Sequence, residues 1–574
     1  MTRRHGAVHV VTTSRTYKGT VYQTHLLRRS YREGARVRNE TVGNLSHLPA
    51  HIIDLVRRAL HDEAIIPLDQ FEIVRSRAHG AVQAVLTTMD RLGFGRLLAS
   101  RPCPEADRVR AMVAARVLEP HTKLATTRWW QTCTLAEDLG VGDTTEDDLY
   151  AAMDWLLARQ SRIQQTLATR HLTEGGLVLY DLTSSYFEGT TCPLAKRGHN
   201  RDGVRDKLQV NFGLITNAQG CPVAVDVVDG NVADPTTLLP QIHRVRESFG
   251  IQDFVVVGDR GMIAQKAIDE LQTLPGVGWI TALKTAQIRA LLGTPLQLGL
   301  FDDRDLVGFT HPDYPGERLV ACRNPALAAR RAYKRQALID ATIAQLEKVK
   351  GMVARGKLRD RGDIGVRVGR VINKYHVAKH FSLTIADGRF TYARRTARIT
   401  AEAALDGIYV IRTSVPESRL SDADTVRAYK SLSHVERAFR TLKSIDLHVR
   451  PIHHRLADRV RSHIFLCVLA YYVEWHMREA WRPLLFADEH LAAKATRDPV
   501  APVHRSAAAD HKAATHRTTD DTPVHSFRTL LGDLGTIVRN HCRTRATTDA
   551  PTFAVTTTAT EAQRRALDLL KAIA

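Results

Sequence analysis

Residues 176–284 carry an ordered series of strand and helix patterns that restricts the fold more than any other stretch of the chain. Three apolar, strand-like runs come first, each bounded by a glycine, and they cover residues 176–189, 207–220 and 221–231. A helical run at 236–250 and a buried strand at 253–259 follow, and then a helix at 263–271 and a strand at 276–284. Strands that alternate with helices in this way are typical of an α/β domain.

This order, with three strands, a helix, a strand, a helix and a strand, is the order of an RNase H-like fold. We therefore expect an α/β fold with a mixed five-stranded sheet and helices on both faces. In such a sheet the first and fourth strands lie side by side. Asp181 lies on the first strand and Asp259 at the end of the fourth. The pattern predicts that these two carboxylates are neighbours.

A long helix is predicted much later in the chain, over residues 421–443. Ser421 and Asp424 have the spacing of a capping box, and no Gly or Pro interrupts the stretch that follows. At about 3.6 residues per turn, one face of this helix presents a set of polar side chains. These are Tyr429, Glu436, Lys443 and, beside them, Arg440. Such a face is most often a surface ion-pair network, so Glu436 gains functional meaning only together with the two aspartates.

The chain is strongly basic, with 81 Lys and Arg against 61 Asp and Glu and a net charge of +20. This excess predicts a polyanionic partner, nucleic acid first, with ribosomal or membrane-surface binding as the alternative. The seven cysteines are scattered without a CxxC pair, which argues against a zinc ribbon or a disulfide framework and predicts a reducing cytosol. The longest apolar run, at 464–472, is too short to cross a bilayer, so we expect no membrane partner.

Composition and periodicity divide the chain into seven parts. The first is a β-hairpin and helix segment at 1–80, followed by a helical domain at 81–174 that is a candidate for binding DNA ends. The catalytic domain covers 175–283 and 401–482, with an insertion at 284–400 between its parts. A flexible linker is predicted at 483–525, and a helical tail at 526–574. The basic side chains of the N-terminal segment and of the insertion are equally consistent with DNA contact and with solvated surfaces.

Three carboxylates, Asp181, Asp259 and Glu436, form the smallest ligand set for a pair of metal ions. Magnesium prefers carboxylate oxygen. Two such ions about 3.5–4 Å apart can activate an attacking hydroxyl and stabilise a leaving oxygen in phosphodiester chemistry. Asp181 is the candidate to bridge both ions, and the attacking group is water or a DNA 3′-hydroxyl. We therefore expect two Mg²⁺ ions as cofactors, with Mn²⁺ as a substitute.

The chain resembles the DDE transposases of bacterial insertion sequences, in the group with a Y-R-E-K signature. Tyr429, Glu436 and Lys443 have the spacing of that signature, whereas Leu432 occupies its Arg position. Further similar segments, in the same order, are YDLTSSYFEG around Asp181, GNVAD at 230–234, GDRGM around Asp259, DGIYVIRTS at 406–414 and VERAFRTLKS at 435–444. The similarity covers roughly residues 20–480.

This resemblance implies cut-and-paste transposition by a synaptic homodimer that acts on double-stranded DNA, namely the terminal inverted repeats and a target. It leaves open whether the ends pass through a hairpin. It also implies action in the cytoplasm, in association with the nucleoid. The implied metal ligands are Asp181, Asp259 and Glu436. The implied phosphate contacts come from Tyr429 and Lys443, with Arg440 and Arg260 as further candidates.

Two other functions remain compatible with the residues alone. One is a stand-alone RNase H-like nuclease such as a resolvase, although a minimal nuclease needs neither the insertion nor the helical domain. The other is a catalytically inactive DNA-binding derivative of the same scaffold. The presence of all three acids argues against that second alternative.

Overall fold

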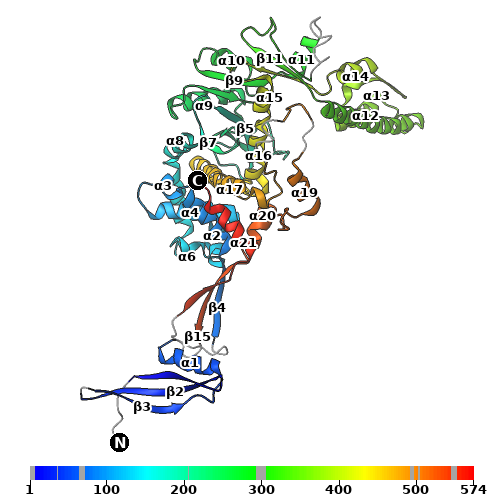
Figure 1. Ribbon diagram of the computed structural model, residues 1–574. Coiled ribbons are helices and arrows are strands. Elements are labelled where there is room, and N and C mark those ends of the chain that lie inside the picture. Colours follow the sequence, from blue (N-terminus) through cyan, green and yellow to red (C-terminus); the bar gives the residue numbers. More distant parts are fainter. Residues whose placement is uncertain are drawn as a thin grey trace. The chain divides into compact units, whose positions relative to one another are not determined.

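The computed structural model describes residues 7–34, 36–63, 71–204, 206–292, 305–490, 497–501, 505–544 and 552–573. Its contacts divide the chain into two compact units (Figure 1). One unit consists of residues 1–76 and 539–557, and the other of residues 77–538 and 558–574. None of the described helices combines the length and the apolar composition that a bilayer crossing requires.

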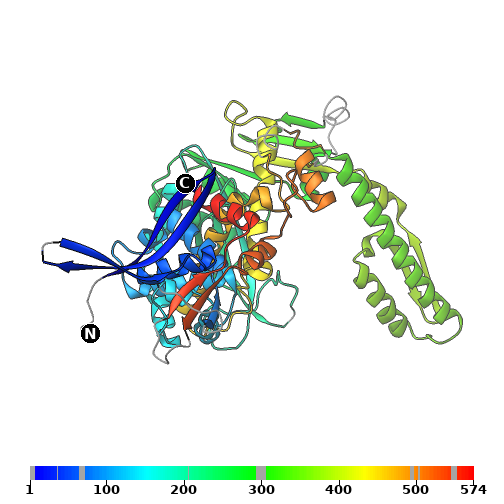
Figure 2. The same cartoon turned by 60° about the horizontal axis from the view of Figure 1, so that its bottom comes forward.

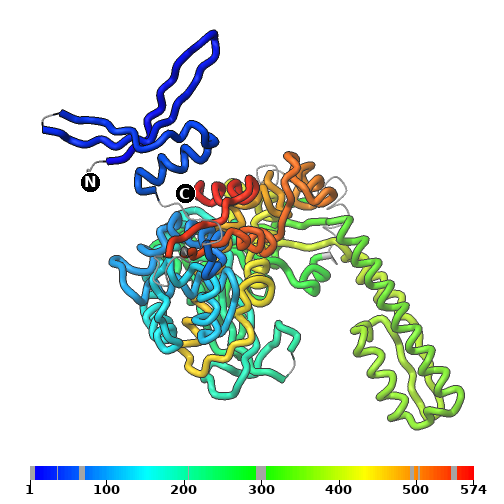
Figure 3. The backbone as a smooth tube through the Cα atoms, turned by 90° about the horizontal axis from the view of Figure 1, so that it is seen from below, coloured from blue at the N-terminus to red at the C-terminus, as the bar shows by residue number. Residues whose placement is uncertain are grey.

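The smaller unit is built from two antiparallel sheets and one helix. Strands β1 (Val8–Tyr17), β2 (Thr20–Glu33) and β3 (Arg36–Asn44) form the first sheet, and α1 (Ala50–Leu60) lies beside it (Figure 3). The second sheet has the order β16 (Phe553–Thr556), β15 (Val538–Thr544), β4 (Phe71–Ala78). The stretch predicted as a helical tail therefore also contains two strands, one of which pairs with the N-terminal segment.

Residues 80–171 of the larger unit are helical. The helices are α2 (Gly80–Arg91), α3 (Phe94–Leu98), α4 (Pro104–Leu118), α5 (Lys123–Trp129), α6 (Leu135–Asp138), α7 (Glu146–Leu157) and α8 (Gln160–His171). Thr145 starts α7 with a capping box to Asp148, which satisfies two backbone groups at the helix end. Short 3₁₀ turns occur at Trp130–Thr132, Ala378–His380 and Arg482–Leu484.

The centre of the larger unit is a mixed sheet of eight strands. These are β5 (Leu177–Phe187), β6 (Leu208–Asn217), β7 (Pro222–Asp229), β8 (Phe254–Val257), β9 (Val277–Ala282), β10 (Leu306–Phe309), β11 (Arg318–Arg323) and β14 (Ile408–Thr413). Their order is β10-β11-β14-β9-β8-β5-β6-β7. The pairs β5–β8 and β8–β9 are parallel and the others antiparallel. The predicted mixed α/β fold is confirmed, but β14, β11 and β10 extend the predicted five strands to eight.

Helices cover both faces of this sheet. Tyr180 and Thr183 lie three residues apart on β5, so they point to opposite faces. Tyr180 lies close to Thr237 on α9 (Pro235–Glu247). Thr183 lies opposite Phe212 of β6, and Phe212 packs edge-on against Phe439 from a later helix. The other helices of this region are α10 (Gln265–Leu271) and α11 (Thr285–Leu292).

The predicted insertion at 284–400 has a different boundary in the structure. Its β10 and β11 belong to the central sheet. The part with its own hydrophobic core consists of α12 (Pro325–Ala354), α13 (Arg361–Tyr375), the hairpin β12 (Phe381–Ala386) and β13 (Arg389–Arg394), and α14 (Thr396–Ala403). Figure 2 shows α13 and the hairpin alongside the long α12.

The prediction of a single helix over 421–443 is wrong, because the structure divides this stretch into three parts. These are α15 (Asp422–Lys430), α16 (Leu432–Arg440) and a π-helical turn (Thr441–Ile445). At the break, the Ser431 hydroxyl donates a 2.6 Å hydrogen bond to the carbonyl of Ala428. A continuous helix would use that carbonyl for its own backbone, and a serine side chain competes with such a bond. The predicted start is confirmed, since the Ser421 hydroxyl accepts the N–H of Asp424.

A long buried helix, α17 (Ala457–Ala480), connects the helical region to the sheet, because it packs against α4, α7 and β7. The remaining helices are α19 (Ala507–Thr515), α20 (Phe527–Leu534) and α21 (Glu561–Lys571). Helix α19 lies inside the stretch predicted as a flexible linker, and its buried Lys512 forms a 2.6 Å ion pair with Glu489. One continuous core joins the helices, the sheet and α17.

Candidate active site

The parallel pair β5–β8 brings Asp181 and Asp259 to corresponding positions. In its register, Leu179 of β5 lies opposite Val257 of β8. Asp181 and Asp259 each follow that pair by two residues, Asp181 within β5 and Asp259 just beyond the end of β8. Because paired parallel strands keep a constant offset, the two aspartates become neighbours. The structure thus brings these two predicted residues together.

Glu436 reaches the same region because α16 packs on the face of the sheet that carries Asp181. Asp181 and Thr183 alternate with Leu182 and share that face. Phe439, one turn after Glu436 on α16, packs edge-on against Phe212 on this face, with ring centroids 5.7 Å apart. The aromatic contact holds the polar side of α16 over the end of β5.

The turn between β6 and β7 holds the first turn of α16 at close range. His434 Nδ1 lies 2.9 Å from the carbonyl oxygen of Ala218 in this turn. A Cβ atom on Gly220 would lie only 2.7 Å from the Cβ of His434, and Gly220 has a φ of +86°. Both the left-handed backbone and the close approach therefore require glycine at this position.

All three predicted acids line one cavity of about 620 Å³. The remaining lining residues are Leu182, Thr183, Arg201, Asp202, Asp234, Tyr429, Lys430, Leu432, Ser433, Phe439, Arg440, Lys443, Ser444 and Arg450. Among the described residues, Arg260 is the one predicted site residue outside this lining. Within the described part of the chain, the oxygens of the three acids do not all lie within 4.8 Å of one another. One ion therefore cannot be held by all three without movement.

The surroundings of Asp181 disfavour its negative charge. Burial is the main cause that raises the pKa of Asp181 to about 7, and the charges of Asp259 and Asp234 add to it. The backbone N–H of Leu182, which donates a 2.8 Å hydrogen bond, and the nearby Arg201 act in the opposite direction. A bound divalent cation would relieve this repulsion among carboxylates. Their oxygens are also the ligands that Mg²⁺ and Mn²⁺ prefer, so the residues fit such ions.

Tyr429, near the end of α15, contacts one of the two aspartates. Its hydroxyl donates a 3.4 Å hydrogen bond to Oδ1 of Asp259. Burial and the charge of Asp259 raise the pKa of Tyr429, so the phenol keeps its proton at neutral pH. Leu432, at the Arg position of the signature, also lines the cavity and contributes no charge there. Arg440 is exposed and supplies a cation eight residues further on.

Asp202 is a residue of this site that sequence reasoning missed. Its side chain is only 1% exposed and forms ion pairs with two cations. Lys443 Nζ lies at 2.8 Å and Arg450 at 2.5 Å from its carboxylate. Its second oxygen accepts the backbone N–H of Tyr186 at 2.9 Å. Lys443 also lines the cavity, and its ammonium contacts the carboxylate of Asp202. No local pattern distinguishes Asp202 from the other polar residues of its loop, because its burial depends on distant parts of the chain.

Arg201 and Asp234, which both line the cavity, form a second ion pair. Arg201 donates a hydrogen bond to Asp234, the last residue of the GNVAD segment. The backbone N–H of Arg201 in turn donates to the Ser184 hydroxyl at 3.1 Å. This anchors the loop that carries both Arg201 and Asp202 to strand β5.

Comparison with known families agrees with this geometry. A family model described as "Transposase DDE domain" matches residues 174–473, more than half of the chain, and includes all three acids. The chain therefore belongs to the DDE transposases. A second family model, described as "IS1634 family transposase, N-terminal domain", matches residues 10–64. Together they identify a transposase of the insertion-sequence type, an enzyme of a class that acts on DNA with divalent metal ions.

One solved structure with similarity to this chain is titled "Cryo-EM structure of piggyBac transposase synaptic complex with hairpin DNA". It is 8% identical, has a TM-score of 0.35, and the match covers 79% of this chain and 76% of that chain. No curated protein sequence matches the chain.

Proposed function

We propose that this transposase cleaves and joins DNA through two Mg²⁺ ions held by Asp181, Asp259 and Glu436. The observation that carries this proposal is that two strand aspartates and a helical glutamate line one cavity. Bound there, the ions would activate the attacking oxygen and stabilise the leaving oxygen. The ligand oxygens suit Mn²⁺ as well.

The chain's own residues have distinct parts in this proposal. Asp181, on strand β5 and close to Asp259, would be the ligand shared by both ions. Tyr429 donates its hydrogen bond to Asp259 and so orients that carboxylate. Glu436 comes from α16, which is anchored by Phe439 on one side and by His434 on the other.

The proposed fold is RNase H-like, in a transposase of the Y-R-E-K signature group. The strand order β7-β6-β5-β8-β9 supports it, with the first three strands antiparallel and the last two parallel. The spacing of Tyr429, Glu436 and Lys443 supports the signature group, although Leu432 departs from it.

DNA phosphates are proposed to contact Tyr429, Lys443, Arg440 and Arg260. The cluster around Asp202 supports this, because Lys443 and Arg450 bring two positive charges to one buried negative charge. One positive charge is thus in surplus within this cluster of three residues. Arg440 and Arg260 are both exposed, which leaves them accessible to a polyanion.

The proposed assembly is a homodimer that holds two inverted-repeat ends and a target DNA. The helical residues 81–174 are the proposed end-binding domain, and the basic α12 is proposed to cover DNA. The resemblance to insertion-sequence transposases and the net charge of +20 support these assignments. Since the proposed substrate is bacterial DNA, the proposed place of action is the cytoplasm, at the nucleoid.

A strand-transfer assay tests the function. Full-length protein is incubated with a pre-cleaved element end, Mg²⁺ and a target plasmid. We expect joined product that disappears when EDTA replaces Mg²⁺. Cleavage without joining would favour a nuclease such as a resolvase, and binding alone would favour an inactive DNA-binding derivative; either outcome would overturn the proposal.

A further inference from the structure

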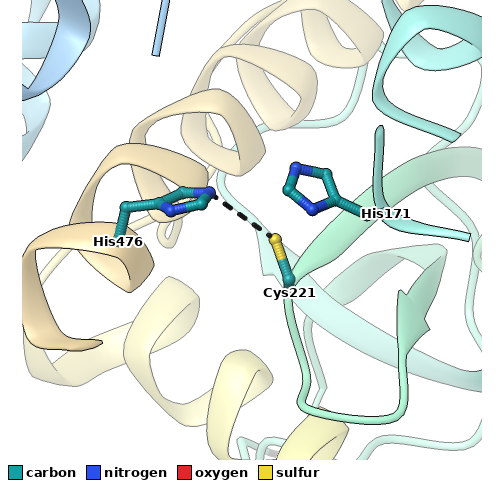
Figure 4. Close-up of side chains that lie close together, drawn as sticks. All are labelled: His171, Cys221 and His476. Atoms are coloured by element: carbon teal, nitrogen blue, oxygen red, sulfur yellow. Dashed lines mark hydrogen bonds between the residues drawn. The ribbon is translucent and has the colours of Figure 1, made fainter. Parts of the chain in front are cut away.

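Two histidines and a cysteine converge outside the cavity that the three acids line. His171 is the last residue of α8, Cys221 immediately precedes β7, and His476 lies on α17. Figure 4 shows the three side chains pointing toward one another. One potential ligand atom from each lies within 4.8 Å of the other two, and Sγ of Cys221 is 3.9 Å from Nε2 of His476.

The separation between Cys221 and His476 is close to that of two ligands in a tetrahedral zinc site. Zinc binds thiolate sulfur at about 2.3 Å and imidazole nitrogen at about 2.0–2.1 Å. In a tetrahedron these lengths separate sulfur from nitrogen by about 3.5 Å. The observed 3.9 Å between Cys221 and His476 therefore requires only a small inward movement to reach a ligand geometry.

We propose that His171, Cys221 and His476 bind one Zn²⁺ ion that fastens the helical region to the central sheet. The ion takes two neutral imidazoles and one thiolate, and the thiol proton leaves to solvent as the Zn–S bond forms. A water molecule fills the fourth position. The three ligands come from α8, the start of β7 and α17, so the ion links three elements that meet at the edge strand of the sheet.

A hydrogen-bonded neighbour supports this assignment. The Tyr472 hydroxyl lies 3.0 Å from Nε2 of His171, which leaves Nδ1 of that ring for the ion. Outer hydrogen bonds of this kind fix the orientation of metal-binding histidines. Tyr472 also lies one helical turn before His476, and the two rings are 4.7 Å apart. The same tyrosine therefore positions both imidazoles.

The donor atoms of this site differ from those of the acidic cavity. Imidazole and thiolate favour zinc, whereas carboxylate oxygens favour magnesium and manganese. Cys221 is completely buried, so its sulfur is protected from bulk solvent. Zinc at the cluster is therefore expected to remain bound in millimolar Mg²⁺. Its presence can be measured without any transposition assay, and the inference does not depend on the proposed function.

The test uses the purified full-length protein. We expect about one equivalent of zinc per chain by elemental analysis. We also expect Co²⁺ to produce tetrahedral d–d bands and a near-ultraviolet thiolate-to-cobalt band. Cys221→Ser should remove the thiolate band, and His476→Gln should weaken Co²⁺ binding by roughly 100-fold. Cys322→Ser is the matched control, because Cys322 is equally buried and its sulfur faces Tyr409 and a backbone oxygen.

Thermal unfolding distinguishes this site from simple aromatic packing. Zinc should raise the melting temperature of the wild type and of Cys322→Ser, but not that of Cys221→Ser. If a cysteine variant does not fold, His476→Gln is used in its place, because it keeps Cys221. Zinc should not raise the melting temperature of His476→Gln either. The proposal is overturned if the wild type carries no zinc and shows no thiolate band at saturating Co²⁺. It is equally overturned if Cys322→Ser loses the band and Cys221→Ser keeps it.

Discussion

Lys443 donates a 2.8 Å hydrogen bond to the buried carboxylate of Asp202, across 241 residues of sequence. Arg450 contacts the same oxygen, and the N–H of Tyr186 contacts the other. The bond connects the π-helical turn after α16 with the loop between β5 and β6. It therefore fixes the end of the segment that carries Glu436.

Asp202→Asn should lower the free energy of unfolding by at least about 2 kcal/mol, because it leaves two partly buried cations without their counter-charge. Urea unfolding measures the loss. Asp206→Asn in the same loop is the control, since Asp206 forms only an exposed 4.0 Å pair with Arg197 and such pairs contribute little. Equal stability of the two variants would contradict a supporting role for Asp202.

Lys443→Met should weaken the binding of transposon ends and reduce the slope of log K against log salt by about 0.9, as expected for one lost phosphate contact. Asp202→Asn should act in the opposite direction and strengthen binding at low salt, because it removes a negative charge from the cavity. Filter binding over a range of salt concentrations measures both. Arg419→Gln, a surface arginine paired with Asp253, is the control. A slope unaffected by Lys443→Met would mean that this lysine is only structural.

Asp181→Asn, Asp259→Asn and Glu436→Gln should each reduce strand transfer by at least about 10³-fold while end binding stays near wild type. The physical reason is that each change removes a ligand oxygen charge from the metal pair. Asp253→Asn is the matched control, because Asp253 lies at the opposite end of β8 from Asp259 and is exposed. Activity within about tenfold of wild type in any one of the three variants would remove that residue from the ligand set.

The affinity for Mg²⁺ should fall as the pH is lowered below about 7. Burial and the neighbouring carboxylates raise the pKa of Asp181 to about 7, so below that pH the carboxyl is protonated and an ion must displace the proton. The dissociation constant should then increase by up to about tenfold per pH unit. Mn²⁺ titration followed by electron paramagnetic resonance measures this. The pH values 5.5 and 7.5 lie about 1.5 units below and about 0.5 units above that pKa. An affinity that stays constant between them would show that Asp181 is not a ligand.

The strands and their acids could be predicted because their signals are local. Asp181 and Asp259 each lie in or at the end of a short apolar run, and the sheet order that pairs them follows from the sequence of elements. The start of α15 was also predictable, since Ser421 and Asp424 are three residues apart. Glu436 could be included because its spacing from Tyr429 and Lys443 matches the Y-R-E-K signature.

The remaining features depend on contacts between distant residues. Ser431 ends α15 through its own side-chain hydrogen bond, which competes with the helix in a way that helix periodicity does not reveal. Asp202 is buried by Lys443 and Arg450, both more than 200 residues away. The cluster of His171, Cys221 and His476 also depends on contacts between distant residues. The spacing of the three residues in the sequence therefore matches no metal-binding motif. The sequence places β10 and β11 in the insertion, because nothing local shows that they pair with β14.

Fe²⁺-directed cleavage of the protein backbone tests the central claim most directly. Fe²⁺ is bound in place of Mg²⁺, and ascorbate with peroxide produces hydroxyl radicals that cut the chain near the ion. We predict simultaneous cuts near Asp181, Asp259 and Glu436, all suppressed by excess Mg²⁺ and absent in Asp181→Asn. Cuts near the two aspartates without a cut near Glu436, with and without bound DNA, would contradict the account.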